Sequence, residues 1–291
     1  GLPWDWNSYG EYLNSIEKLR PAINVTGLVG HCASRVYVMG ARAVDEQPTS
    51  AEIAQIAALI GQSVKDGAVG FSTNRLPGHT LPDGRSIPGT FATEEELVAI
   101  SKAVGENGGF LQSVLNYAKL PEEMALLKKQ LKAAGTRLLF SAPWNPGNEG
   151  TNGYQSAILD MQAEGMDITG LTLPRSGGFV SGLKTDILFG FRFAAPAWRE
   201  LRAMDFDARL AAIRDNDFRT RLIDDAKQVE HSDRMAHAFF WLGQTDRPTY
   251  TNSVDQSLFN LAKAAGEHPA ETWIRYMLES NGVGLFHLRF F

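Results

Sequence analysis

The chain has 291 residues, 44% of them hydrophobic, and a formal net charge of −5 with acidic and basic side chains mixed along its length. It has no basic run or stripe, which argues against nucleic acid as a partner, and no apolar stretch as long as a membrane-spanning helix needs. The one cysteine, Cys32, excludes an internal disulfide framework and is typical of a reducing compartment, so a cytoplasmic location is expected.

Five short apolar strands separated by amphipathic helices are predicted in the first 175 residues. A first helix is expected over residues 7–19, and later helices are expected to begin near Thr49, Thr93, Pro121 and Gln155. The strands are expected at 23–35, 67–75, 108–116, 136–145 and 166–175. Near-continuous apolar strands that alternate with helices indicate a parallel sheet covered on both faces.

The pattern changes after residue 175. Residues 176–250 are predicted to form a helical insertion or lid, with helices near 196–203, 207–215 and 217–229. Residues 251–291 are predicted to return to the sheet through helices at 254–265 and 269–280 and a strand-like run from Phe286 to Phe291. All three segments are assigned to one domain. The first residue is not Met and the last run has no polar tail, so the chain is interpreted as an internal piece of a longer polypeptide.

Two α/β architectures are compatible with five strands in this order, an open doubly wound sheet and part of a (β/α)8 barrel. No G-x-G-x-x-G or Walker-type loop follows the first strand, so a dinucleotide or nucleoside triphosphate site has no support. A partial (β/α)8 barrel of the TIM type is therefore predicted. In such barrels, ligands bind beyond the carboxyl ends of the strands.

Polar residues follow each apolar run at that expected edge. His31 and Arg35 end the first run, and His31 has two interpretations: a metal ligand or acid–base group, or a histidine that ties two loops together. Cys32 has no supporting spacing and is interpreted as a small buried residue. Trp144, which follows the fourth run, is interpreted as a pocket wall or as an aromatic cap.

The longest polar loop follows the second run. It contains Asn74, Arg75 and His79, and a guanidinium fork is well suited to clamp a carboxylate, so Arg75 and His79 are predicted to bind substrate. The alternative is a surface loop pinned by its three prolines. Arg175, after the fifth run, is predicted to bind an anion or to pair with an acidic neighbour.

The sequence contains no complete catalytic set of its own. H-x-H, H-E-x-x-H, C-x-x-C and G-x-S-x-G are all absent, and His231 and His237 do not have the spacing of a helical metal pair.

Several segments nevertheless resemble one family. They are SYGEYL, AINVTGLVGHCASR with VMG, DGAVGFSTNR and GTFATEEELVAISKAVGENGG, followed by LPRSGG and SLFNLAKAAGEHPAETWIRYMLE. The resemblance is to the D-aminoacylase (N-acyl-D-amino-acid deacylase) branch of the amidohydrolase superfamily. It implies a metal-dependent (β/α)8 barrel that hydrolyses the amide bond of N-acylated D-amino acids.

The resemblance also implies where the metal ligands lie. The family's H-x-H lies upstream of Gly1 and its catalytic aspartate beyond Phe291, so the catalytic residues of this chain are unknown. Two further family histidines correspond to Ser113 and Ala142, which cannot replace an imidazole as strong zinc ligands. The resemblance therefore implies a divalent metal, zinc by family chemistry, in the full-length protein, with ligands mostly outside this chain.

Two hypotheses of function follow. In the first, the chain is a segment of an amidohydrolase for a small N-acyl substrate, with His31, Arg35, Asn74, Arg75, His79 and Arg175 on the substrate side. In the second, it belongs to a degenerate amidohydrolase that acts as a binding or scaffold protein. The expected partners are the substrate and the remainder of the polypeptide, with neither nucleic acid nor membrane. The isolated fragment is expected to be inactive and prone to oligomerise.

Overall fold

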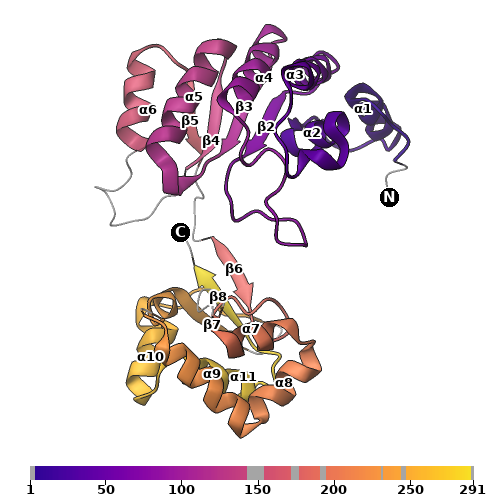
Figure 1. Cartoon of the computed structure of the whole chain (residues 1–291). Coiled ribbons are helices and arrows are strands. Elements are labelled where there is room, and N and C mark those ends of the chain that lie inside the picture. The colour runs from indigo at the N-terminus through magenta and orange to yellow at the C-terminus, as the bar shows by residue number, and fades with distance from the viewer. Residues whose placement is uncertain are drawn as a thin grey trace. The chain divides into compact units, whose positions relative to one another are not determined.

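A computed structural model describes residues 4–142, 154–171, 177–190, 195–230, 232–243 and 247–289. The chain divides into two compact units, Gly1–Thr172 and Leu173–Phe291 (Figure 1). No helix in these described ranges is long and apolar enough to cross a membrane.

The first unit contains a five-stranded parallel sheet whose strands lie in sequence order. The strands are β1 (Leu28–Gly30), β2 (Gly70–Asn74), β3 (Phe110–Val114), β4 (Leu138–Ser141) and β5 (Ile168–Leu171). In the register of the sheet, Val29, Phe71, Leu111, Leu138 and Ile168 follow one another across the five strands, and all are buried. The predicted α/β class with a parallel sheet is confirmed.

The helices of this unit connect the strands and cover one face of the sheet (Figure 1). Crossovers between parallel strands are right-handed as a rule, and here each new strand is added on the same side of the sheet, so successive helices are expected on the same face. They are α1 (Tyr9–Lys18), α2 (His31–Met39), α3 (Ser50–Lys65), α4 (Glu94–Glu106), α5 (Leu120–Ala134) and α6 (Tyr154–Ala163), with short 3-10 turns at Gly40–Ala43 and Tyr117–Lys119.

Burial alternates along the strands, which differs from the prediction of a sheet covered on both faces. Phe71 and Leu111 are buried beneath the helices, whereas their neighbours Ser72 and Gln112 are partly exposed. Thr169 in β5 is exposed. The apolar runs are short, so a period of two is hard to distinguish from continuous hydrophobicity in sequence. The second face, called the open face here, carries Ser72, Gln112, Asn74 and Thr169.

Cap residues set the helix boundaries close to those predicted. Thr49 and Glu52 form a reciprocal capping box at the start of α3, and the Thr93 side chain caps α4. The first strand is shorter than predicted, because the chain turns into α2 at His31 instead of continuing to residue 35.

The second unit has its own sheet, which is antiparallel. Its strands β6 (Gly178–Ser181), β7 (Phe239–Gly243) and β8 (Leu285–Arg289) lie in the order β6-β8-β7. The helices are α7 (Pro196–Ala203), α8 (Phe206–Arg214), α9 (Asn216–Gln228), α10 (Leu258–Ala265) and α11 (Pro269–Glu279), with 3-10 turns at Arg234–Ala238 and Val254–Gln256. These helices agree with those predicted.

The strand pairing of β8 differs from the predicted return of residues 251–291 to the parallel sheet. In the described residues β8 pairs with β6 and β7, and its Phe286 and Leu288 are buried in a core that also contains Trp198 and Trp273. Residues predicted as the insertion and residues predicted as the return therefore share one core. An apolar strand at a chain end does not specify its pairing partner, which is why the sequence pattern was misleading here.

Candidate functional site

The carboxyl edge of the parallel sheet brings the ends of β1, β2 and β3 together. Gly30 lies opposite Ser72, which lies opposite Gln112. The chain stays paired just beyond the strands, because the Arg75 backbone N–H donates to the Val114 carbonyl at 2.8 Å. Four of the six predicted site residues lie near this edge. His31 and Arg35 follow β1, Asn74 ends β2 and Arg75 comes directly after it.

His31 is the first residue of α2 and lies beneath the helices, away from the open face. Only 2% of its surface is exposed. Its Nδ1 lies 2.8 Å from the Thr73 hydroxyl and its Nε2 lies 2.9 Å from a Glu96 carboxylate oxygen. The ring meets Phe71 edge to face at 5.3 Å between centroids. Both ring nitrogens are therefore occupied within the protein.

Burial lowers the pKa of His31, and the hydrogen bond and charge of Glu96 oppose that effect without cancelling it. The imidazole is accordingly neutral at pH 7. In the tautomer that satisfies both contacts, Nε2–H donates a hydrogen bond to Glu96 and Nδ1 accepts a hydrogen bond from the Thr73 hydroxyl.

Glu96 also binds Arg35, the second residue predicted at this strand end. Arg35 Nη1 donates to the other Glu96 carboxylate oxygen at 2.9 Å, and Nη2 donates to the Glu46 carbonyl at 2.8 Å. The exposed surface of Arg35 is 2% and that of Glu96 is 0%. One carboxylate in the first turn of α4 therefore holds two side chains from α2.

The hydroxyl, imidazole and carboxylate of Thr73, His31 and Glu96 have the order of a nucleophile, its base and an orienting acid. Their burial excludes that use in this conformation, because Thr73 is only 3% exposed and no substrate atom could reach it. The geometry favours the second interpretation of His31, a histidine that ties segments of the chain together. Its role in substrate binding stays a prediction.

Arg75 forms a comparable internal ion pair. Its Nε donates to both carboxylate oxygens of Glu123 at 3.0 and 2.7 Å, and its Nη1 donates to the Ala92 carbonyl at 3.0 Å. The Arg75 side chain is 15% exposed and that of Glu123 5%. The donors expected to clamp a substrate carboxylate therefore already hold a carboxylate of α5.

His79 does not join Arg75 in the structure. It is exposed in the loop over residues 76–91, and its backbone N–H donates to the Leu76 carbonyl at 3.1 Å. No hydrogen bond of its imidazole occurs within the described ranges. The predicted pairing of Arg75 and His79 around one ligand is thus not present in this conformation.

The open face is where accessible polar chemistry remains. The Ser72 hydroxyl donates to the Gln112 side-chain oxygen at 2.5 Å. Asn74, two residues along β2 on the same face, has a buried Oδ1 with no hydrogen-bond partner in the described part of the chain. Its Nδ2 makes a long contact of 3.4 Å with the Leu76 carbonyl. A buried carbonyl oxygen without a hydrogen-bond partner is uncommon in folded proteins.

The residues at the two expected metal positions do not fit a metal. Ser113 is 1% exposed and lies on the same side of β3 as Leu111, beneath the helices. Ala142 packs against the core of the first unit. Across the described ranges, no group of three or more His, Cys, Asp and Glu side chains could hold a metal ion. No catalytic step through a metal is therefore derived from these residues.

Two residues with a predicted role, Trp144 and Arg175, and also His231 lie outside the described residues. The sequence patterns did not indicate Glu96 and Glu123, the two carboxylates that hold His31, Arg35 and Arg75. Both lie in the first turns of helices. Acidic residues are common there because a negative charge interacts favourably with the positive end of the helix dipole. The available signal was the helical spacing of Glu96 with the buried Ile100, which places it on the face toward the sheet.

A solved structure of D-aminoacylase, described as defining a novel subset of amidohydrolases, has the same fold. The similarity covers 98% of this chain and 47% of that chain, at a TM-score of 0.50 and 15% sequence identity. The five-stranded sheet matches part of the amidohydrolase TIM-barrel fold, to which the antiparallel sheet and its helices are added. At this identity, the similarity shows the fold alone.

The names of the curated relatives that match this chain indicate no activity. Uncharacterized proteins of Mycobacterium bovis and Mycobacterium tuberculosis are each 34% identical to this chain over 116 residues, which is 37% of this chain. The matched region is 19% of the length of each relative. This chain thus matches less than half of the length of the D-aminoacylase and about a fifth of the mycobacterial proteins. No family model matches it.

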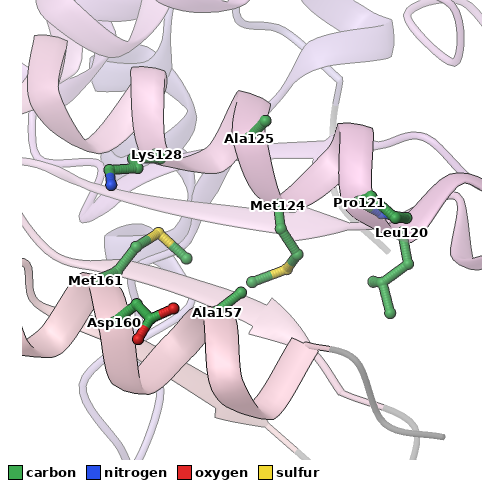
Figure 2. Close-up of a pocket in the computed structure, with 8 residues that line it drawn as sticks. All are labelled: Leu120, Pro121, Met124, Ala125, Lys128, Ala157, Asp160 and Met161. Atoms are coloured by element: carbon green, nitrogen blue, oxygen red, sulfur yellow. The ribbon is translucent and has the colours of Figure 1, made fainter.

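Two cavities of the first unit lie away from the open face. One, of about 340 Å³, lies between α5 and α6, where Met124, Ala157 and Met161 point toward one another (Figure 2). The other, of about 740 Å³, is lined by Gly108, Thr136 and Asp167, which precede β3, β4 and β5. The first cavity lies between two of the covering helices and the second lies where the strands begin, whereas barrel enzymes bind substrate at the carboxyl ends of their strands, so neither cavity is assigned to catalysis.

Proposed function

We propose that the protein carrying this sequence is an amidohydrolase that cleaves amide C–N bonds, with N-acyl-D-amino acids as the substrate class. The observation that supports this proposal is the similarity to D-aminoacylase over 98% of the chain. A second support is the polar open face, because barrel enzymes place substrates at the carboxyl ends of their strands. This chain matches less than half of the length of the D-aminoacylase, so the activity is proposed for the whole protein that carries it.

In this proposal the chain contributes substrate-binding groups. Asn74 is the principal one, because it ends β2 at the carboxyl edge of the open face, is partly exposed there and carries an amide that can hydrogen-bond to the substrate amide. Gln112 is the next polar group along the open face, on β3. His31, Arg35 and Arg75 act as positioning residues, which hold the strand ends through Glu96 and Glu123.

A divalent metal, zinc by family chemistry, is part of the proposal for the full-length protein, with ligands outside this chain. When bound, such a metal activates water for attack on the amide carbonyl. The described residues supply no ligand set for it.

Hydrolysis of matched N-acyl-D- and N-acyl-L-amino acids by the full-length protein, before and after treatment with a chelator, tests this function. We expect chelator-sensitive release of the D-amino acid, and no release from any substrate would refute the proposal. Asn74→Ala should lower kcat/KM by about tenfold or more, as expected when a substrate hydrogen bond of roughly 1.4 kcal/mol is lost. Gln55→Ala, exposed on α3, is the control and should leave kcat/KM unchanged.

Arg75→Lys separates positioning from direct substrate binding. If Arg75 acts through Glu123, the variant should lose stability, because Lys cannot make the same paired contact, while KM stays within about twofold. A rise in KM of about tenfold with unchanged stability would instead show that Arg75 binds the substrate carboxylate.

A binding or scaffold function is the second candidate, and Ser113 and Ala142 favour it because neither side chain is a strong metal ligand. Metal analysis of the purified full-length protein distinguishes the two. A content near one tightly held metal per chain supports the hydrolase, whereas a metal-free protein without hydrolytic activity supports the scaffold.

A further inference from the structure

The cavity of about 340 Å³ between α5 and α6 has apolar walls and a charged end. Figure 2 shows Met124 and Ala157 facing each other across it, with Leu120 toward one end and Lys128 and Asp160 toward the other. Its volume is at the lower end of the range for small-molecule sites. The cavity lies among the helices, away from the open face, so its occupant is independent of the proposed hydrolase activity.

The walls of this cavity are suited to an alkyl chain. Met124 and Met161 line it from the hydrophobic core of the first unit, and only 4% and 2% of their surfaces are exposed. Leu120, Ala125 and Ala157 add further apolar groups. Because a methionine side chain is unbranched and flexible, it adapts to the shape of a bound apolar group. A short alkyl chain in the cavity would gain free energy by leaving water for this apolar lining.

The two charged residues of the lining differ in whether they have a partner. Lys128 is bound to Glu164, which follows α6 and does not line the cavity. Asp160 is exposed, and its carboxylate makes no hydrogen bond or ion pair in the part of the chain that the structure describes. The charge of the lysine is therefore compensated, whereas an accessible carboxylate is available to a ligand.

This distribution of charge favours a cation over a neutral or an anionic ligand. A cation at the charged end would be attracted by the Asp160 carboxylate. An anion would be repelled by the same carboxylate and would find Lys128 already paired. A neutral ligand would gain only the contacts with the apolar walls.

We propose that this cavity binds a small alkylammonium ion, whose ammonium group donates to the Asp160 carboxylate and whose alkyl chain contacts Met124 and Met161. An ammonium group is compact and carries three N–H donors, so it can bind the carboxylate while its chain lies along the apolar walls. Because Asp160 is exposed, the ion pair contributes modestly and the alkyl contacts supply the larger part of the affinity.

The methionine methyl resonances of the full-length protein, labelled with ¹³C at these methyl groups, test the proposal. n-Butylammonium is the probe, and n-butanol and butyrate are the neutral and anionic comparisons of equal chain length. We expect n-butylammonium to shift Met124 and Met161 saturably, at about three- to fivefold lower concentration than n-butanol, and to leave Met235 of the second unit unshifted. Equal or tighter binding of n-butanol or butyrate would overturn the cationic class, and no saturable shift would overturn the site.

Asp160→Asn removes the charge and keeps the size of the side chain. It should weaken binding of n-butylammonium to the level of n-butanol and leave binding of n-butanol unchanged. Glu95→Gln is the control, because Glu95 is exposed on α4 and does not line the cavity, so it removes one negative charge elsewhere. Equal weakening by both variants would show that Asp160 does not bind the ammonium group.

Ala157→Phe fills the cavity from α6 and should abolish the saturable shifts. Ser156→Phe is the matched control, because Ser156 is the preceding residue of the same helix, is exposed and does not line the cavity. Unchanged binding by Ala157→Phe would place the probe elsewhere and contradict the proposal. If Ala157→Phe does not fold, nuclear Overhauser contacts between the butyl chain and the Met124 methyl group in the unmodified protein decide the question, and their absence would overturn the site.

Discussion

Glu96 is the central residue of a buried cluster that it forms with His31 and Arg35. Its two carboxylate oxygens are divided between the His31 imidazole and the Arg35 guanidinium, both at 2.9 Å, and none of its surface is exposed. A buried charge of this kind is tolerated because its partners compensate it. Loss of the carboxylate charge would leave Arg35 buried without a counter-ion.

Glu96→Gln should therefore lower the free energy of unfolding by about 3–5 kcal/mol, as expected when one partner of a buried ion pair is removed. Glu94→Gln is the control in the same helical turn, because Glu94 pairs with Lys129 and both side chains are 54% exposed. This control should cost less than about 1 kcal/mol. Urea denaturation measures both, and equal losses would show that Glu96 is not a central contact.

His31 makes the stability of the first unit depend on pH. Its pKa in the folded chain lies below the ordinary value of 6.5, mainly because of burial, so the folded state binds fewer protons here than the unfolded state. The free energy of unfolding should accordingly be highest above pH 6.5 and should fall as the pH drops below it.

His31→Gln tests this dependence, because the amide can replace both hydrogen bonds but does not titrate in this range. Unfolding of both proteins at a series of pH values from about 8 to 5 should show a steeper loss for the unmodified chain. His268 and His287, whose pKa values are also lowered by burial, are present in both proteins. Parallel curves would contradict the assigned role of His31.

Two helices of the first unit use the same arrangement at the sheet edge. Glu96 of α4 binds Arg35 from α2, which follows β1, and Glu123 of α5 binds Arg75, which follows β2. In each case a helix N-terminal turn supplies the carboxylate and a residue after an earlier strand supplies the arginine. These ion pairs fix the chain just after β1 and β2. Because both guanidinium groups bind internal carboxylates, the two arginines point into the protein.

The loop over residues 76–91 packs against this arrangement through Gly89. Gly89 has φ of +93°, and a Cβ at this position would lie 2.7 Å from His31 Nδ1. Gly84, in the same loop, has φ of +88° but no atom within 4 Å of such a Cβ. The two glycines therefore share a backbone conformation that residues with a Cβ rarely adopt, and they differ in packing.

Gly84→Ala should cost about 1 kcal/mol, from the unfavourable φ alone. Gly89→Ala should cost at least about 1 kcal/mol more, because the loop or His31 must move to relieve the overlap. Thermal or urea unfolding of the two variants measures the difference. Equal costs would show that the contact between the loop and His31 does not constrain the fold.

The sequence predicts the elements of the first unit better than the orientation of its polar side chains. Apolar runs and cap residues such as Thr49 and Thr93 are local signals, and the strands and helices follow them closely. Whether Arg75 faces a ligand or an internal carboxylate depends on Glu123, which lies 48 residues away in the chain. Periodicity and spacing carry no information about such a distant pair.

At the scale of the whole molecule, the chain has two hydrophobic cores formed by separate sets of residues. The core of the first unit includes Leu127 of α5 together with Phe71 and Leu111 of the sheet. The core of the second includes Leu222 of α9 together with Trp198 and Trp273. Because burial of apolar surface is the main stabilising contribution, each unit has its own source of stability.

We therefore expect each unit to respond to mutations in its own core. Leu127→Ala and Leu222→Ala remove the same atoms from fully buried sites, and each should cost about 2–5 kcal/mol. Hydrogen exchange followed by mass spectrometry should show faster exchange in the strands β1–β5 for Leu127→Ala and in β6–β8 for Leu222→Ala. Faster exchange throughout both units in either variant would show that they unfold as one cooperative structure, despite their separate cores.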